Sequence, residues 1–195
     1  ETLSGESVEG LWFGARLKPG LRQLGVRSVQ PGSPAARAGL RPGDLVLEID
    51  GQPVPGLIEL NRRLVAAGTR RDLRLGVQRD GERQRRTLTL RLQEETEFFN
   101  LDLLRQRLGL GLRPTREGCV VAEVEAGGPA SARRLEKGML VLAFDGQPAA
   151  DVVAFAKAVH ARARGETIEL DVVFTRGWTR YRTTVAVAVR APSNE

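Results

Sequence analysis

Few side chains in this 195-residue protein could do nucleophilic or metal chemistry, because it holds one histidine, His160, and one cysteine, Cys119. Zinc sites take three or four His, Cys or carboxylate ligands, so this pair cannot build an ordinary one. Cys119 begins an apolar stretch and has no partner for an internal disulfide, so we expect a buried, inert thiol. We expect His160 at a partly exposed position on a helix. The sequence predicts no metal and no cofactor.

Two features could bind phosphate groups, and neither has the full pattern. Gly109-x-Gly111 resembles the start of a dinucleotide loop, but no third glycine follows and Pro114 intervenes. The net charge is +6, with the densest arginine cluster within residues 70–86. Acidic residues are interspersed and only 5% of residues are aromatic, so platforms for stacking bases are scarce. We expect a solvated arginine-rich surface and no nucleic-acid partner.

The strongest signal is an internal repeat. The stretch PGSPAARAGLRPGDLVLEIDG (residues 31–51) recurs as AGGPASARRLEKGMLVLAFDG (residues 126–146), displaced by 95 positions. Without a gap, 13 of the 25 residues from 29 to 53 are identical to their counterparts. Solenoid repeats run to roughly 20–50 residues, so this unit is too long for one. Two copies of one compact domain fit better.

The repeat predicts the domain organisation. We expect a first domain at residues 1–93, which includes a short N-terminal connector at 1–10, and a second domain at 108–195. The connecting segment 94–107 starts with the acidic run EETE, which is typical of a helix start, and continues with apolar residues that should pack on a domain. No apolar run approaches the ~18 residues of a membrane span, so no direct span is expected.

Each copy is predicted to be strand, short helix, strand, longer helix and hairpin. Ser33 is expected to cap the short helix, with Pro34 at its first position. The first copy should have strands at 12–17, 45–49, 73–78 and 85–92, with a helix from 57. The second should have a helix at 151–162 and strands at 168–174 and 179–189. The expected fold class is α+β, mainly β: two small, partly open β-barrels or sandwiches, each capped by two helices.

These ordered segments resemble a PDZ domain in the permuted strand order of bacterial proteins. The stretch GSPAARAGLRPGDLVLEIDGQPV (residues 32–54) is especially similar to the first PDZ domain of HtrA/Deg-type (DegP, DegQ, Do) serine proteases. LWFGARL (residues 11–17) looks like that family's carboxylate-binding loop, and the repeat gives RLGLGL (residues 107–112) the same role. The second copy departs from the pattern where Arg134 replaces Gly39 and Met139 replaces Asp44.

The resemblance implies a peptide bound as an added strand on a sheet edge, with its terminal carboxylate held by backbone amides. The implied donors are the amides of Phe13, Gly14 and Ala15, and those of Leu108, Gly109 and Leu110. The implied groove walls are Leu57, Asn61 and Leu64 in the first copy, and Val152, Ala156 and Val159 in the second.

Other residues of the implied site leave alternatives open. Leu57 and Leu64 could instead be plain core residues, and His160 could line the second groove. Arg16 could assist the carboxylate if its side chain points that way. Because the loop is expected at the rim of the domain, a β-branched residue in place of Gly14 or Gly109 should abolish binding and leave the fold largely intact.

An HtrA/Deg protease cuts with a Ser-His-Asp triad. No nucleophile segment of that family is present, since LSGES (residues 3–7) lacks its glycines, and the single histidine falls inside the second copy. We therefore expect a non-catalytic segment. The only methionine is Met139, so we expect a mature or excised piece.

The resemblance implies the regulatory and substrate-recruiting region of an HtrA-like serine endopeptidase in protein quality control, in the periplasm or another extracytoplasmic space. Its implied partners are peptides, unfolded segments and other protomers of an oligomeric protease. The alternative is a free-standing tandem-PDZ adaptor.

Overall fold

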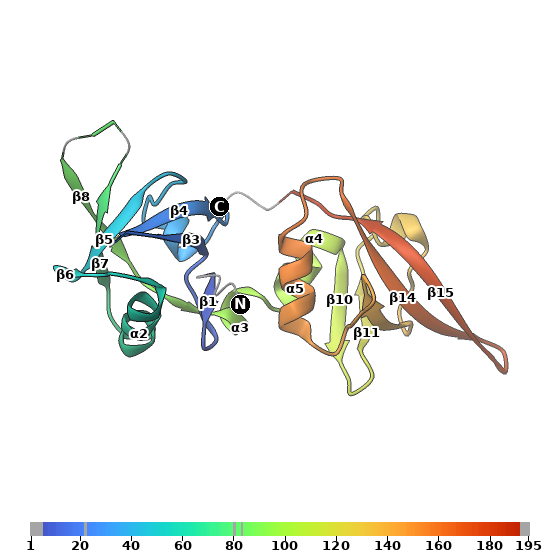
Figure 1. Ribbon diagram of the computed structural model, residues 1–195. Coiled ribbons are helices and arrows are strands. Elements are labelled where there is room, and N and C mark those ends of the chain that lie inside the picture. Colours follow the sequence, from blue (N-terminus) through green and yellow to red (C-terminus); the bar gives the residue numbers. More distant parts are fainter. Residues whose placement is uncertain (1–5, 22, 80, 83, 192–195) are drawn as a thin grey trace. The chain divides into compact units, whose positions relative to one another are not determined.

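The computed structural model describes residues 6–21, 23–79, 81–82 and 84–191 (Figure 1). The chain forms two compact units, Glu1–Glu97 and Phe98–Glu195. The border between them lies inside the segment that the sequence assigns to the connection. Each unit has its own sheet and its own core, and each is described by itself below.

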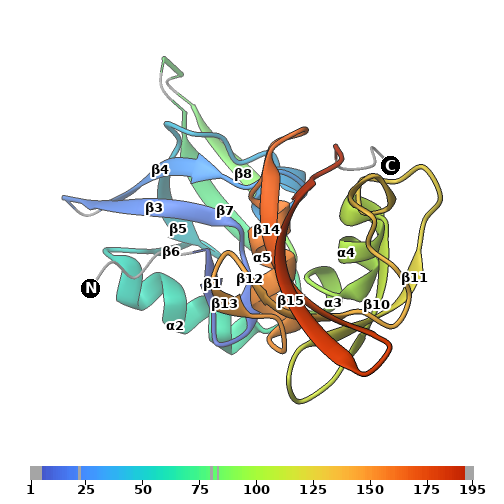
Figure 2. The same cartoon turned by 90° about the vertical axis from the view of Figure 1, so that its right-hand side faces the viewer.

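The first unit is built on an open, antiparallel sheet in the order β3-β4-β5-β7-β8, with β6 paired to β5. Its strands are β3 (Ala15–Gly20), β4 (Gln23–Val29), β5 (Leu45–Ile49), β6 (Gln52–Pro53), β7 (Leu73–Gln78) and β8 (Arg85–Leu90). Its helices are α1 (Pro34–Arg37) and α2 (Leu57–Ala67). Figure 2 shows α2 along one side of this sheet. Strand β5 and helix α2 begin where the apolar pattern predicts, because their apolar residues must reach one core.

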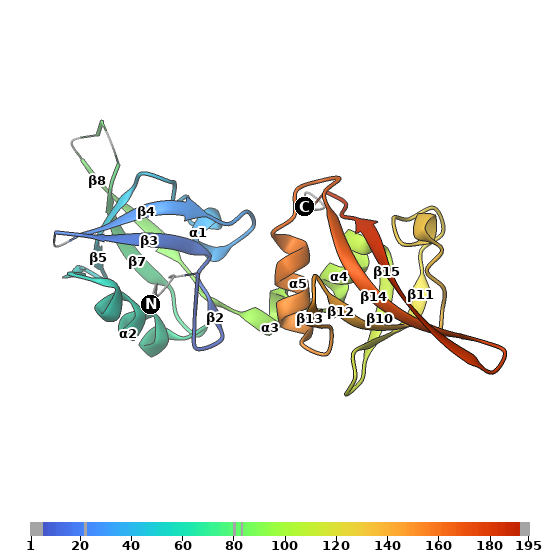
Figure 3. The same cartoon turned by 45° about the vertical axis from the view of Figure 1, so that its right-hand side comes forward.

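A second, small sheet in the first unit was not predicted. It joins β1 (Ser7–Val8), β2 (Leu11–Trp12) and β9 (Gln93–Glu94) in the order β1-β2-β9. The strand expected at 12–17 is interrupted between β2 and β3, where Gly14 adopts a φ of +81°. Residues 1–10 were expected to be a plain connector, but their described end forms β1 and a hairpin turn to β2 (Figure 3).

The second unit repeats the first. Its sheet has the order β10-β11-β12-β14-β15, with β13 paired to β12. Its strands are β10 (Leu110–Pro114), β11 (Cys119–Val124), β12 (Leu140–Phe144), β13 (Gln147–Pro148), β14 (Thr167–Arg176) and β15 (Thr179–Ala188). A 3₁₀ turn at Ser131–Arg133 takes the place of α1, and α5 (Val152–His160) that of α2. The hairpin of β14 and β15 projects beyond the rest of the unit (Figures 1 and 3).

The acidic run does begin a helix, as predicted. Helix α3 (Glu95–Phe98) is followed by α4 (Leu101–Leu108), whose N-cap is Asn100. The Asn100 side chain accepts hydrogen bonds from the amides of Asp102 and Leu103, which satisfies donors that an α-helix leaves free at its start. Phe99 and Leu104 are buried, so the connecting segment packs as its apolar residues indicate.

The same irregularities occur at the same places in both units. The register shifts between Arg16 and Leu17 and, 95 positions later, between Gly111 and Leu112. The Ser33 hydroxyl caps α1 by accepting from the Ala36 amide at 3.1 Å, as predicted. In the second unit Arg134, which stands where the first has Gly39, takes a left-handed φ of +57° and ends the turn. The shared backbone path therefore tolerates a residue that glycine would suit better.

Candidate functional site

Strands β3 and β10 are the first strands of their sheets, so each has a free edge among the described strands. In the first unit the Gln30 amide donates to the Gly14 carbonyl, which places Ala15 and Val29 in a non-hydrogen-bonded pair of the ladder. In such a pair the N–H and C=O groups point away from the partner strand. The N–H and C=O groups of Ala15 therefore face the open edge.

The second unit has the same geometry. The Glu125 amide donates to the Gly109 carbonyl at 2.9 Å, and Leu110 pairs with Val124. By the same ladder rule, the amide of Leu110 faces the open edge of β10. An edge strand with unpaired backbone groups is the surface to which another strand can be added.

In the first unit, the other two amides of the predicted loop already have an acceptor. The amides of Phe13 and Gly14 both donate to the carbonyl oxygen of Glu6, at 3.0 and 2.8 Å. Two N–H groups therefore converge on one oxygen, as the resemblance implies for a carboxylate. The sequence did not single out Glu6, because a hairpin turn of Glu9 and Gly10 lacks the Asn-Gly or Asp-Gly signal of such turns.

Arg16 lies beside this loop. Its Nε donates to a carboxylate oxygen of Glu6 at 2.9 Å, and its second guanidinium nitrogen lies 2.8 Å from the same oxygen. The side chain therefore reaches the loop from β3 and places a cation next to the two amides. Its side chain is 50% exposed, so solvent screens this charge.

In the second unit, the corresponding amides belong to a helix. Leu108 is the last residue of α4, and the Gly109 amide donates to the Arg105 carbonyl at 2.8 Å. Gly109 has a left-handed φ of +71° and ends the helix. The amides of Leu108 and Gly109 thus close the last turn of α4, and Leu110 is the loop residue whose amide faces the edge.

The predicted wall residues lie on α2 and α5. Leu57 and Asn61 are half-buried, while Leu64 is buried within the core cluster that also packs against Leu57. Val152 is half-buried, but Ala156 and Val159 are fully buried in a unit where α4 packs against α5. Leu57 and Leu64 therefore contribute to the core, the alternative left open above. The side-chain oxygen of Asn61 is buried and has no hydrogen-bond partner within the described part of the chain.

The expectation that the loop glycines sit at the rim is wrong. Gly14 and Gly109 are both buried. A Cβ added to Gly14 would lie 2.1 Å from the Cβ of Ser33, far inside contact distance. A Cβ on Gly109 would have its nearest neighbour at 3.4 Å, on Glu125. A β-branched residue at Gly14 would therefore disturb the fold as well as the loop.

His160 and Cys119 have structural surroundings. The His160 ring is half-buried and meets the rings of Phe98 and Phe99 edge-on, with centroids 5.1 and 5.6 Å away. Cys119 is fully buried, and its thiol donates to the Ala149 carbonyl at 3.1 Å. Burial raises the pKa of this thiol, because it disfavours the thiolate.

Comparison with known proteins adds to this geometry. The PDZ domain family matches twice, at residues 25–79 and 106–187. A "Probable periplasmic serine endoprotease DegP-like" from Halomonas elongata is 34% identical over 128 residues, which cover 57% of this chain and 27% of that protein. The magnetosome formation protease MamE of Paramagnetospirillum magneticum is 35% identical over 135 residues, or 60% of this chain and 18% of that protein. The periplasmic serine endoprotease DegP of Escherichia coli is 24% identical over 139 residues, covering 70% of this chain and 29% of that protein.

The chain thus spans less than a third of each of these relatives. Among solved structures, the HtrA3 PDZ domain bound to a phage-derived ligand matches with a TM-score of 0.39 and 20% identity, covering 43% of this chain and 85% of that one. In the described residues, no helix is long and apolar enough to cross a membrane. The two family matches together cover more than two thirds of the sequence and fall one in each unit. The chain therefore belongs to the PDZ domain family, as a tandem of two PDZ domains.

Proposed function

We propose that this chain binds extended peptide segments with an apolar, free C-terminus, each added as a strand to the edge of β3 or β10. One observation carries the proposal: both units place an edge strand directly after a buried glycine loop, with a helix packed in the same unit. An added strand gains backbone hydrogen bonds from the edge, and the loop amides can hold its terminal carboxylate. The loop residues are Phe13, Gly14 and Ala15 in the first domain, and Leu108, Gly109 and Leu110 in the second.

The wider role follows from the relatives. Several of them are named periplasmic serine endoproteases, and the chain aligns with only part of each. We propose that the tandem is the regulatory, substrate-recruiting region of an HtrA-like endopeptidase that acts outside the cytoplasm. In that setting it would capture exposed apolar segments of unfolded proteins. The segment itself supplies binding, and the peptide-bond chemistry belongs to the catalytic part of such a protein.

Calorimetric titration of the whole chain with paired peptides tests the binding proposal. The peptides share one apolar sequence and differ only in a free or amidated C-terminus. Hydrogen bonds to a charged group contribute roughly 1.5–3 kcal/mol, so amidation should weaken binding about 10- to 100-fold. Equal affinities for the two forms would show that the loops do not read the terminus. No binding of either form would reject the proposed function.

A further inference from the structure

The contact between Glu6 and the first loop has the chemistry of a bound peptide end. The Glu6 carbonyl oxygen receives the amides of Phe13 and Gly14, which are the donors proposed above for a peptide carboxylate. The two amides cannot bind the Glu6 carbonyl oxygen and a peptide carboxylate oxygen at the same position at the same time. The first domain therefore has its carboxylate position filled by its own chain.

The side chain of Glu6 adds a second similarity to the end of a bound peptide. Its carboxylate pairs with Arg16, whose Nε lies 2.9 Å from Oε1. Glu6 thus brings an oxygen to the two amides and a negative charge to the neighbouring cation. The last residue of a peptide would bring the same two features, so Glu6 neutralises the charge that would attract it.

The segment around Glu6 also lies against the predicted groove wall. Strand β1 runs antiparallel to β2, with Ser7 opposite Trp12 and Val8 opposite Leu11. It contacts α2, and Val8 packs against the core of the first domain. Residues 6–8, which we call the strap, therefore touch both the loop and the helix of the same site.

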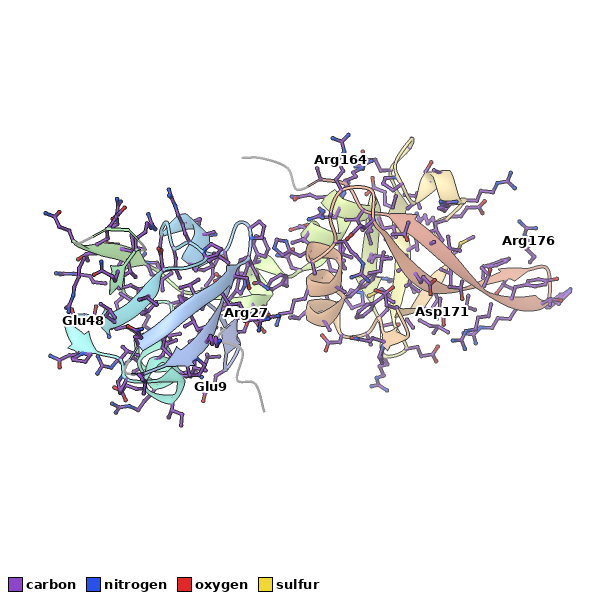
Figure 4. All side chains as sticks on the ribbon, turned by 45° about the horizontal axis from the view of Figure 1, so that its top comes forward. Glu9, Arg27, Glu48, Arg164, Asp171 and Arg176 are labelled. Atoms are coloured by element: carbon purple, nitrogen blue, oxygen red, sulfur yellow. The ribbon has the colours of Figure 1, made fainter. Side chains whose placement is uncertain are left out.

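We propose that the strap is an intramolecular ligand of the first PDZ domain, and that a peptide binds this domain by displacing it. This inference rests on the proposed function, because it names what regulates that same site. The strap can leave without unfolding the domain. It contains a two-residue strand followed by the turn at Glu9 and Gly10, and its ion pair with Arg16 is partly exposed to solvent. Figure 4 labels Glu9 in this turn.

Within its described residues, the second domain has no separate segment that accepts from the corresponding amides. Its corresponding amides, those of Leu108 and Gly109, close the last turn of α4. To free them, the helix must unwind there. The competition between a strap and a peptide therefore concerns the first domain alone.

The arithmetic of competition sets the expected effect. If the strap is open for only a fraction of the time, the apparent affinity of the first domain is its intrinsic affinity multiplied by that fraction. A strap open about 10% of the time weakens peptide binding about 10-fold. A substitution that loosens the strap should therefore raise the peptide affinity of the first domain about 10-fold and leave the peptide affinity of the second domain unchanged.

The test uses the full chain with the double substitution Glu6→Lys and Gly10→Val. The first reverses the charge facing Arg16, and the second places a β-branched residue at a φ of +76°, where the space is open, so that strain falls on the turn alone. The control is Gly177→Val in the β14–β15 turn, which has a φ of +59° and equally open space. NMR titration with the free-acid apolar peptide follows the Gly14 amide for the first domain and the Gly109 amide for the second.

We expect the dissociation constant at Gly14 to fall about 10-fold in the double variant and to stay unchanged in the control. An unchanged constant at Gly14 overturns the strap proposal while leaving peptide binding in place. If the peptide perturbs neither Gly14 nor Gly109 in any form, the proposed function fails, and the strap proposal fails with it.

A second measurement needs no substitution. In the unmodified chain, saturating peptide should speed hydrogen exchange at the Val8 amide, because displacement breaks the pairing of β1 with β2. The Gly14 amide should stay protected, since the peptide replaces Glu6 as its acceptor. Protection of Val8 that persists in the bound state, with Gly14 perturbed by peptide, would show that peptide and strap bind together and would overturn the proposal.

Discussion

Asp44 and Arg79 of the first domain form an ion pair, and both residues differ at the corresponding positions of the second domain. Asp44 is 1% exposed and holds the guanidinium of Arg79 with contacts of 2.8 Å. At the repeat distance of 95, Met139 and Phe174 stand in their places, and both line one cavity of the second domain. The sequence showed the Asp-to-Met change as a departure. It did not show that a change from Arg to Phe compensates for it, because the partner lies 35 residues away.

Removing one member of this pair should be costly, and replacing both should not. We expect Asp44→Ala to lower the free energy of unfolding of the first domain, because it removes the buried carboxylate that accepts from both the Arg79 side chain and the Arg41 amide. The double substitution Asp44→Met with Arg79→Phe, which copies the second domain, should cost less than half as much. Urea unfolding of the three chains checks this. A double variant as unstable as the single one would contradict it.

The same pair predicts a dependence of stability on pH. Burial opposes ionisation of Asp44, but hydrogen bonds from Arg79 and from the Arg41 amide outweigh it and hold its pKa below the usual 3.8. A group with a lowered folded-state pKa stabilises the fold above its unfolded pKa and loses that contribution as pH falls through the folded pKa. Acidification below pH 3.8 should therefore destabilise the first domain through this group. Asp44→Asn should flatten this part of the pH profile when melting is followed.

The loop glycines offer a matched comparison. Gly14→Ala places a Cβ 2.1 Å from the Cβ of Ser33, whereas Gly109→Ala meets nothing closer than 3.4 Å. Both residues have positive φ, which costs an alanine about 1 kcal/mol. We expect Gly109→Ala to cost the second domain about that much, and Gly14→Ala to cost the first about 3 kcal/mol because of the added clash. Equal losses in thermal or urea unfolding would contradict the role assigned to Ser33.

At the level of elements, local pattern predicted what lies within one segment. The apolar run at 45–49 gave β5 with its bounds, and Ser33 with Pro34 gave the start of α1. Strand β1 could not be predicted, because two residues show no periodicity and the turn that joins them to β2 has a weak sequence signal. The hydrogen bonds from the loop amides to Glu6 could not be predicted either, since they depend on the position that the Glu6 carbonyl takes once the β1–β2 hairpin has formed.

The long β14–β15 hairpin depends on cross-strand contacts near its end. Phe174 and Tyr181 face each other with ring centroids 5.5 Å apart, and the guanidinium of Arg176 lies 5.7 Å from the Phe174 ring. Figure 4 shows Arg176 toward the tip of the hairpin, beyond Asp171. Trp178 in the turn is fully exposed. The ring pair, and not the tryptophan, should therefore hold the outer strands together.

We expect Tyr181→Thr to fray the hairpin, at a cost of about 1 kcal/mol in local stability. Hydrogen exchange at Arg176 and Thr179, which form the pair that closes the turn, should quicken accordingly. Trp178→Thr serves as the control and should leave these rates unchanged, because the tryptophan side chain is exposed. Equal quickening in both variants would show that the turn, rather than the ring pair, limits fraying.

At the level of the whole molecule, each unit has its own sheet, helices and buried core. The sequence predicted two domains because a repeat is visible without a structure. Its expected boundaries, 1–93 and 108–195 with 94–107 between, remain a prediction for solution. The structure adds a sharper place to cut, between Glu97 and Phe98.

Residues 1–97 and 98–195, expressed separately, should each unfold in one cooperative transition, as single domains of this size commonly do. Calorimetry of both pieces checks this, with the whole chain as the control. A second piece beginning at residue 108 would lack Phe99 and Leu104, which are buried, and should lose stability. If neither longer piece unfolds cooperatively, the two units are not independent.

The burial of Cys119 has a practical consequence. It is the only cysteine in the chain, it lies at the start of β11, and its thiol is inaccessible and held in the neutral form. An alkylating reagent can reach this sulfur only during the moments when the second domain opens. The rate of covalent labelling of Cys119 therefore reports how often the second domain opens in the intact tandem, with no engineered probe. Gly14→Ala, which destabilises only the first domain, should leave the labelling rate of Cys119 unchanged.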